Sequence, residues 1–132
     1  MAFTGVGIDV CTIERVAALL GTDMGQYWME RIFTPAERER IPKRFQSDSG
    51  TKKARLAVHI AGLYAGKEAV GKATGKGLMG PGRLAWQDVE ISHTVDGAPE
   101  VTILNGPWAG RKIDISISHD GGIATAIAIL WE

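Results

Sequence analysis

Two Asp-Gly pairs, Asp96-Gly97 and Asp120-Gly121, constrain the fold of the C-terminal half more than any other feature of the chain. Asp-Gly is typical of two-residue hairpin turns, and each pair lies between segments in which apolar and polar residues alternate. The first pair separates 86–95 from 100–104, and the second separates 113–118 from 123–130. This pattern predicts four strands in two antiparallel hairpins. The last segment is apolar at both parities, which predicts a central strand covered on both faces.

The N-terminal part predicts one strand followed by helices. Val6 and Ile8 alternate with Gly5, Gly7 and Asp9, so this strand has one apolar face and one open face. The open face leaves room for a ligand or another chain segment to approach the backbone closely. Helical spacing of apolar residues follows over about 13–20 and 24–32.

A third helix is predicted to begin at Thr34-Pro35-Ala36-Glu37, because Thr34 can cap it while Glu37 reaches back, and to end at Pro42. The polar stretch 46–53 predicts a loop, and the longest helix is expected over about 53–74. One strand, several helices and four strands predict an α+β fold. We expect a mostly antiparallel sheet packed against a long helix and shorter helices.

Composition limits the classes of function. A chain of 132 residues supplies one domain, 1–132, with a modest core whose remaining faces oligomerisation can bury. Fifteen basic residues balance fifteen acidic ones, which argues against a general binder of nucleic acid or of anionic membranes. The only cysteine is Cys11, which excludes an intramolecular disulfide and is typical of the reducing cytoplasm. The longest near-apolar stretch, 123–131, is too short to span a membrane, so we expect a soluble cytoplasmic protein.

The candidates for chemistry are Asp9, Glu68 with Lys67 and Lys72, and the run 116–120. An ionised Asp9 in an apolar strand is costly unless it is paired or binds a cation, although a strand-end aspartate satisfied by the next helix explains this residue equally well. Glu68 and Lys72 share a helix face and would ordinarily be an exposed ion pair. The small residues around them indicate a face that is approached closely, where Glu68 can hold a hard cation and Lys72 a phosphate.

The histidines allow structural and functional interpretations. Ser118-His119-Asp120 resembles a hydrolase triad only in its letters, because neighbouring side chains project in different directions. We therefore exclude serine-hydrolase chemistry. His119 is equally a turn residue or a ligand contact. His59 and His93 lie on regular elements with no titratable partner in view, which favours structural roles.

Five blocks of sequence follow one another from residue 5 to about 130: Gly5-Val6-Gly7-Ile8-Asp9-Val10 with Ile13-Glu14-Arg15; Arg31-Ile32-Phe33-Thr34 with Glu37; Ala65-Gly66-Lys67-Glu68-Ala69 with Lys72-Ala73; Trp86-Gln87-Asp88-Val89-Glu90 with Gly97-Ala98-Pro99; and Ser116-Ile117-Ser118-His119-Asp120. Taken together and in this order, they resemble the holo-(acyl carrier protein) synthase family, the short 4′-phosphopantetheinyl transferases. One block alone is a weak match, whereas five in order are specific.

The resemblance implies Mg²⁺-dependent transfer of 4′-phosphopantetheine from coenzyme A to a serine of an apo acyl carrier protein, releasing adenosine 3′,5′-bisphosphate. By position, Asp9 and Glu68 would bind the Mg²⁺ that holds the coenzyme pyrophosphate. Lys72 would contact phosphate and assist the leaving group. Glu68, directly or through a metal-bound water, would be the base for the carrier serine. His119 would touch the nucleotide side of the coenzyme, and Arg55 its 3′-phosphate.

The resemblance also implies partners. Arg15 and Arg31 match positions whose charge would receive the acidic recognition helix of a carrier protein, and a local basic patch can steer such a partner even at zero net charge. The chain has the length of the short family members, so the resemblance implies a homotrimer with active sites between its subunits. Whether the carrier serves fatty acid or polyketide synthesis is left open.

Two departures from the family pattern keep alternatives open. Leu63 stands where the family usually has arginine, five residues before the helix glutamate, and only 105–112 stand where it commonly inserts a helix. One alternative is a module that binds coenzyme A or a carrier without transferring anything. The other is a Mg²⁺-dependent phosphate ester hydrolase, which would use the same metal with water as acceptor.

Overall fold

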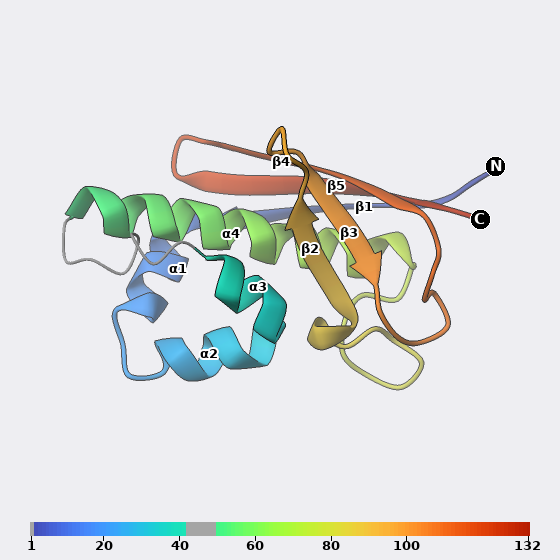
Figure 1. The fold of residues 1–132 in the computed structure, drawn as a ribbon, viewed down its shortest axis with the longest axis horizontal. Helices are drawn as coiled ribbons and strands as arrows, with labels where there is room; N and C mark the ends of the chain where they lie inside the picture. Colours follow the sequence, from blue (N-terminus) through green and yellow to red (C-terminus); the bar gives the residue numbers. More distant parts are fainter. Residues whose placement is uncertain (1, 42–49) are drawn as a thin grey trace.

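The computed structural model describes residues 2–41 and 50–132 and has the predicted α+β architecture (Figure 1). In the first part of the chain, β1 (Phe3–Thr12) is followed by α1 (Ile13–Leu20), α2 (Gly25–Ile32), α3 (Pro35–Arg40) and α4 (Gly50–Ala73). The second part holds β2 (Val89–His93), β3 (Pro99–Ile103), β4 (Ile113–Asp120) and β5 (Ile123–Trp131). An antiparallel sheet has the order β1-β5-β4, and β2 pairs with β3 in a second sheet. Both predicted hairpins are confirmed.

Helix α4 organises the fold. It runs lengthwise along one face of the three-stranded sheet, with α1, α2 and α3 on its other side (Figure 1). Gly5 and Gly7 of β1 face it, and a Cβ built on either glycine would lie 2.0 Å from a helix carbonyl oxygen, that of Ala73 or Ala69. The open face predicted for the first strand is therefore filled by another segment of the same chain.

The opposite face of this sheet is exposed and apolar over β1 and β5. Val6, Ile8 and Val10 are 52%, 61% and 58% exposed, and Ile8 pairs with Ile127 of the neighbouring strand. β5 is the central strand, as predicted, but the prediction that both of its faces are covered is wrong. Burial alternates along β5, because α4 covers only the face of β5 that carries the alanines of this strand. An exposed apolar surface of this kind is typical of an interaction site.

Two predicted boundaries also need correction. α4 begins at Gly50, so 50–53 are helical and do not belong to the predicted loop, while 46–49 and the predicted stop at Pro42 lie outside the described residues. The strand predicted over 86–95 is a strand only from Val89, because Trp86–Asp88 form a 3-10 turn in which the Asp88 carboxylate accepts the backbone N–H of Ala85 at 2.8 Å. Among the described residues, no helix combines the length and apolarity needed to cross a membrane.

A buried ion pair joins α3 to α4. The predicted capping box is confirmed, since the Glu37 N–H donates to Thr34 Oγ1 at 3.1 Å and the Thr34 N–H donates to Glu37 Oε1 at 2.8 Å. Lys67 was a candidate for chemistry, but its Nζ lies in the core, 2.5 Å from Glu37 Oε1, with both side chains fully buried. This ammonium also donates to the backbone carbonyls of Ile32, Trp86 and Val89. Lys67 therefore fixes the rotation of α4 about its own axis, and its side chain points into the core.

Candidate active site

The contact between glycines and α4 sets the position of Asp9. This residue lies two positions beyond Gly7 on the same face of β1, so its carboxylate meets the helix. Lys72 Nζ donates to Asp9 Oδ1 at 3.0 Å and to the carbonyl oxygen of Ile8 at 3.1 Å. The structure thus brings together a strand residue and a helix residue that lie 63 positions apart in the chain.

Glu68 lies one helical turn before Lys72 and lines the same pocket as Asp9. Partial burial raises the pKa of Glu68, the negative charge of Asp9 raises it further, and Lys72 opposes the rise. A carboxylate with a raised pKa is a better proton acceptor than an ordinary glutamate. The mutual repulsion of two carboxylates also favours binding of a cation between them.

Tyr64 lines the same pocket, although the sequence analysis did not single it out. Its hydroxyl interacts with the carboxylate of Glu68, one turn further along α4, and each group shifts the pKa of the other. Burial, followed by the charge of Glu68, raises the pKa of Tyr64 to about 12. The ring stacks on Trp86 with centroids 5.2 Å apart and lies 5.5 Å from Trp28. The spacing of four between Tyr64 and Glu68 was the available sequence signal.

The donor set fits Mg²⁺ bound by a small number of protein ligands. Asp9 and Glu68 face a pocket of about 360 Å³ between β1, α1, α2 and α4. No cluster of three or more His, Cys, Asp or Glu able to hold a metal exists in the described part of the chain. Mg²⁺ suits two carboxylates, because it usually keeps several waters and completes its shell with phosphate oxygens.

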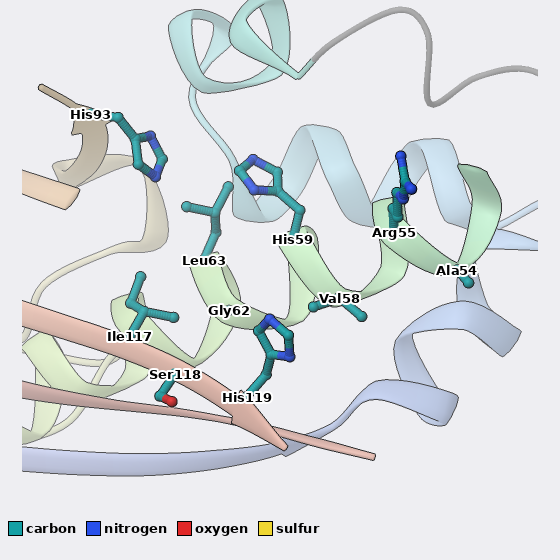
Figure 2. A pocket seen from close by; sticks show the side chains of 10 residues that line it. All are labelled: Ala54, Arg55, Val58, His59, Gly62, Leu63, His93, Ile117, Ser118 and His119. Atoms are coloured by element: carbon teal, nitrogen blue, oxygen red, sulfur yellow. The ribbon is translucent and has the colours of Figure 1, made fainter. Parts of the chain in front are cut away.

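The predicted coenzyme contacts Arg55 and His119 do not line this pocket. They line a second cavity of about 480 Å³, together with His59, Leu63 and His93 (Figure 2). Figure 2 shows His119 reaching from β4 toward Gly62 of α4, and a Cβ on that glycine would touch Ile117 of β4 at 3.0 Å. Because β1 and β4 are opposite edges of the sheet, the two pockets lie on opposite flanks of α4.

The second cavity changes the interpretation of the other histidines. His59 and His93 were expected to lack a titratable partner, but their ring centroids are 5.8 Å apart. Burial lowers the pKa of His59, and His93 lowers it further. Between the rings and the helix, Leu63 is buried at the place where the family pattern has arginine (Figure 2). The expectation that these two histidines lack a titratable partner is therefore wrong.

The two predicted docking arginines lie on neighbouring helices beside the Asp9 pocket. Arg15, exposed on α1, lines that pocket, and Arg31, exposed in the last turn of α2, lines an adjoining one. Leu19 and Trp28 line both pockets, so the two pockets lie side by side. The adjoining pocket also includes two apolar side chains that are more than half exposed and that the sequence did not single out, Met24 and Tyr27.

Comparisons with known proteins find similar sequences and similar structures. The sequence model described as the 4′-phosphopantetheinyl transferase superfamily matches residues 5–128. Holo-[acyl-carrier-protein] synthases are similar to the chain: that of Caldanaerobacter subterraneus subsp. tengcongensis is 35% identical, covering 94% of this chain and 91% of its own. The Protochlamydia amoebophila protein of the same name is 38% identical, covering 97% of each chain. The crystal structure of the Helicobacter pylori enzyme in complex with coenzyme A is similar in fold, with a TM-score of 0.76, 27% identity, and coverage of 96% of this chain and 99% of that one.

Proposed function

Because this chain belongs to the 4′-phosphopantetheinyl transferase superfamily, we propose that it transfers 4′-phosphopantetheine from coenzyme A to a serine of an apo acyl carrier protein. The predicted fold and the predicted class of enzyme are confirmed. The observation that carries the specific proposal is the meeting of Asp9, Glu68 and Lys72 in one pocket, because these groups suit a metal-bound pyrophosphate.

The chemistry assigns a task to each group. The serine Oγ forms a bond to the β-phosphorus of the coenzyme, the bond between that phosphorus and the bridging oxygen breaks, and adenosine 3′,5′-bisphosphate leaves. Glu68 accepts the serine proton, which its raised pKa favours. Lys72 places its ammonium beside the phosphate oxygens and offsets the negative charge of the leaving group. Mg²⁺ held by Asp9 and Glu68 would neutralise pyrophosphate charge.

The docking surface beside the pocket suits an acidic partner. Arg15 on α1 and Arg31 on α2 offer positive charge, and Met24 and Tyr27 at the start of α2 offer exposed apolar contact. An acidic amphipathic helix matches both features, so we place the carrier protein there. Its serine would then approach Glu68 from the open side of the pocket.

We also propose that the protein works as a homotrimer. The exposed apolar face of β1 and β5 gives each copy a surface to bury against another. In one chain, α4 separates the metal pocket from the cavity that holds Arg55 and His119. An assembly that brings the cavity of one subunit beside the metal pocket of the next would let a single coenzyme reach both. The single cysteine suits a reducing compartment, and we propose the cytoplasm.

The test is the intact mass of an apo acyl carrier protein incubated with this protein, coenzyme A and Mg²⁺. The carrier should gain the mass of phosphopantetheine, and EDTA should abolish the gain. Asp9→Asn and Glu68→Gln should each remove transfer without unfolding the protein, while Glu100→Gln on β3 removes an equivalent charge outside both pockets and should leave transfer unchanged.

The remaining outcomes separate the alternatives. Release of adenosine 3′,5′-bisphosphate without any carrier would show a hydrolase. Tight coenzyme binding without transfer to several carriers would show a binding module and would draw attention to Leu63. Wild-type transfer by Asp9→Asn or Glu68→Gln would refute the proposed metal ligands.

A further inference from the structure

The last turn of α2 is held by a side chain from a distant part of the chain. The final carbonyl groups of a helix have no partner within the helix and need one from outside. Gln87, a half-buried residue of the 3-10 turn before β2, supplies this partner. Its Nε2 donates at 2.8, 3.3 and 2.9 Å to the backbone carbonyl oxygens of Glu30, Arg31 and Phe33. Since these oxygens can only accept, the NH₂ group of the amide must face α2.

The backbone that carries Gln87 is fixed on both sides. The 3-10 turn lies beside the end of α2, just before β2 (Figure 1). Trp86, which precedes Gln87, is buried, and its carbonyl oxygen accepts from Lys67 Nζ at 3.0 Å. The carbonyl oxygen of Asp88, which follows Gln87, accepts the N–H of Leu104 at 2.7 Å. Gln87 therefore joins the end of α2 to a part of the chain that is itself held by the core.

The helix that Gln87 holds is weakly anchored in other respects. Only two of the eight residues of α2 are buried, and a helix this short has little stability of its own. Arg31 lies in the last turn of α2, while Met24 and Tyr27 lie exposed at its start. The direction in which these docking side chains point depends on how the helix is held. Arg31 is affected most directly, because its own carbonyl oxygen is one of the three that Gln87 binds.

We propose that Gln87 is a positioning residue for binding of the carrier protein. Its side-chain amide fixes the last turn of α2 and so directs Arg31 toward the carrier. Gln87 lines none of the three pockets described above, so it acts through Arg31 and not by contact with coenzyme or metal. This inference rests on the proposed function and adds to it a residue that sets affinity for the carrier alone.

The experiment measures transfer kinetics and, separately, binding of a fluorescently labelled apo acyl carrier protein by anisotropy. Gln87→Met keeps the length of the side chain and removes its N–H donors. It should raise the KM and the Kd for the carrier roughly tenfold, because hydrogen bonds at the end of α2 are lost, and leave kcat and the KM for coenzyme A unchanged. Gln87→Lys restores a donor, as Lys67 provides one for the carbonyl oxygen of Ile32 at 3.0 Å, and should return the carrier KM to within about twofold of the wild type. Gln26→Met is the matched control, because it makes the same change at an exposed residue of α2 that lines none of the three pockets; it should alter neither constant.

A double-mutant cycle tests whether the effect passes through Arg31. In an Arg31→Ala background, Gln87→Met should raise the carrier KM by less than about threefold, whereas a merely structural role for Gln87 would give the same factor in both backgrounds. Gln87→Asn keeps the amide but shortens its reach, and it should also raise the carrier KM, which provides the test if Gln87→Met does not fold.

The inference is overturned if Gln87→Met leaves the carrier KM unchanged, if Gln26→Met has an equal effect, or if kcat and both KM values change together. The wild-type protein separates the two proposals. Normal transfer by the wild type with no effect of Gln87→Met refutes this inference alone, whereas absence of transfer by the wild type refutes the proposed function.

Discussion

The substitution Gly7→Ala tests whether the close contact between β1 and α4 builds the site. The added Cβ would lie 2.0 Å from the carbonyl oxygen of Ala69 and 2.6 Å from the backbone nitrogen of Ala73. Real Cβ atoms essentially never approach within 3.0 Å, so the strand and the helix must separate by at least 1.0 Å, the difference of the two distances. Both neighbours are backbone atoms and no side-chain rotation can relieve the contact.

Two consequences can be measured. At the upper end of its usual range, overpacking lowers the free energy of unfolding by about 3 kcal/mol. For a chain of this size, this corresponds to a fall of about 10 °C in Tm. Asp9 moves with β1, and a displacement of about 1 Å between catalytic groups lowers the rate about 100-fold. The measurements are thermal unfolding by circular dichroism and kcat in the carrier mass assay.

Gly21→Ala is the matched control. Its Cβ would lie 3.5 Å from the carbonyl oxygen of Ala18, an ordinary contact, so both Tm and kcat should stay near the wild-type values. A Gly7→Ala protein with wild-type Tm and kcat would refute the reasoning. A loss of Tm without a loss of kcat at 20 °C would show that α4 packs on β1 without positioning Asp9.

The other predictions concern different parts of the molecule. Lys67→Met should lower the free energy of unfolding by about 3–5 kcal/mol in urea titrations, because it leaves Glu37 charged and buried, and a loss below 1 kcal/mol would contradict the buried pair. Arg15→Glu should raise the KM for the carrier and weaken its salt dependence while the KM for coenzyme A stays constant; an unchanged carrier KM would contradict the docking surface. Ile8→Glu should shift sedimentation toward the monomer, and an unchanged oligomer would show that this face is not the interface. His59 has a pKa below its ordinary value of 6.5, so the unfolded chain binds a proton at this residue more readily than the folded protein does. The Tm should therefore fall as the pH drops through 6.5, and His59→Asn should reduce the difference in Tm between pH 7.5 and pH 5.5. An equal difference in both proteins would refute the lowered pKa.

Local sequence determined the elements. The Asp-Gly pairs specified both hairpins because few residues adopt the backbone angles of a two-residue turn, and Gly97 has a φ of 90°. The capping box of Thr34 and Glu37 specified the start of α3, because its two hydrogen bonds join residues only three positions apart. The errors at 86–88 and 50–53 arose at element boundaries, where hydrogen bonds such as that of Asp88 decide the outcome.

Lys67 and Glu68 show the limit of sequence reasoning about a site. They are neighbours in the chain, and either could have been the group that faces a ligand. The packing of α4 between two layers turned Lys67 into the core, against Glu37, and turned Glu68 toward Asp9. Successive residues of a helix point about 100° apart, so the choice depended on which face the sheet covered.

The sequence by itself determined the family, the kinds of secondary structure and the candidate residues for a metal and a phosphate, since each follows from local spacing or from ordered blocks. The tertiary structure alone decided that Asp9 meets Lys72, that Arg55 and His119 lie on the other flank of α4, and that three histidines share one cavity. The physical reason is distance along the chain. Contacts between residues 50 or more positions apart depend on how whole elements pack. A single residue such as Gly7 affects that packing because its lack of a side chain lets the backbone of α4 come close.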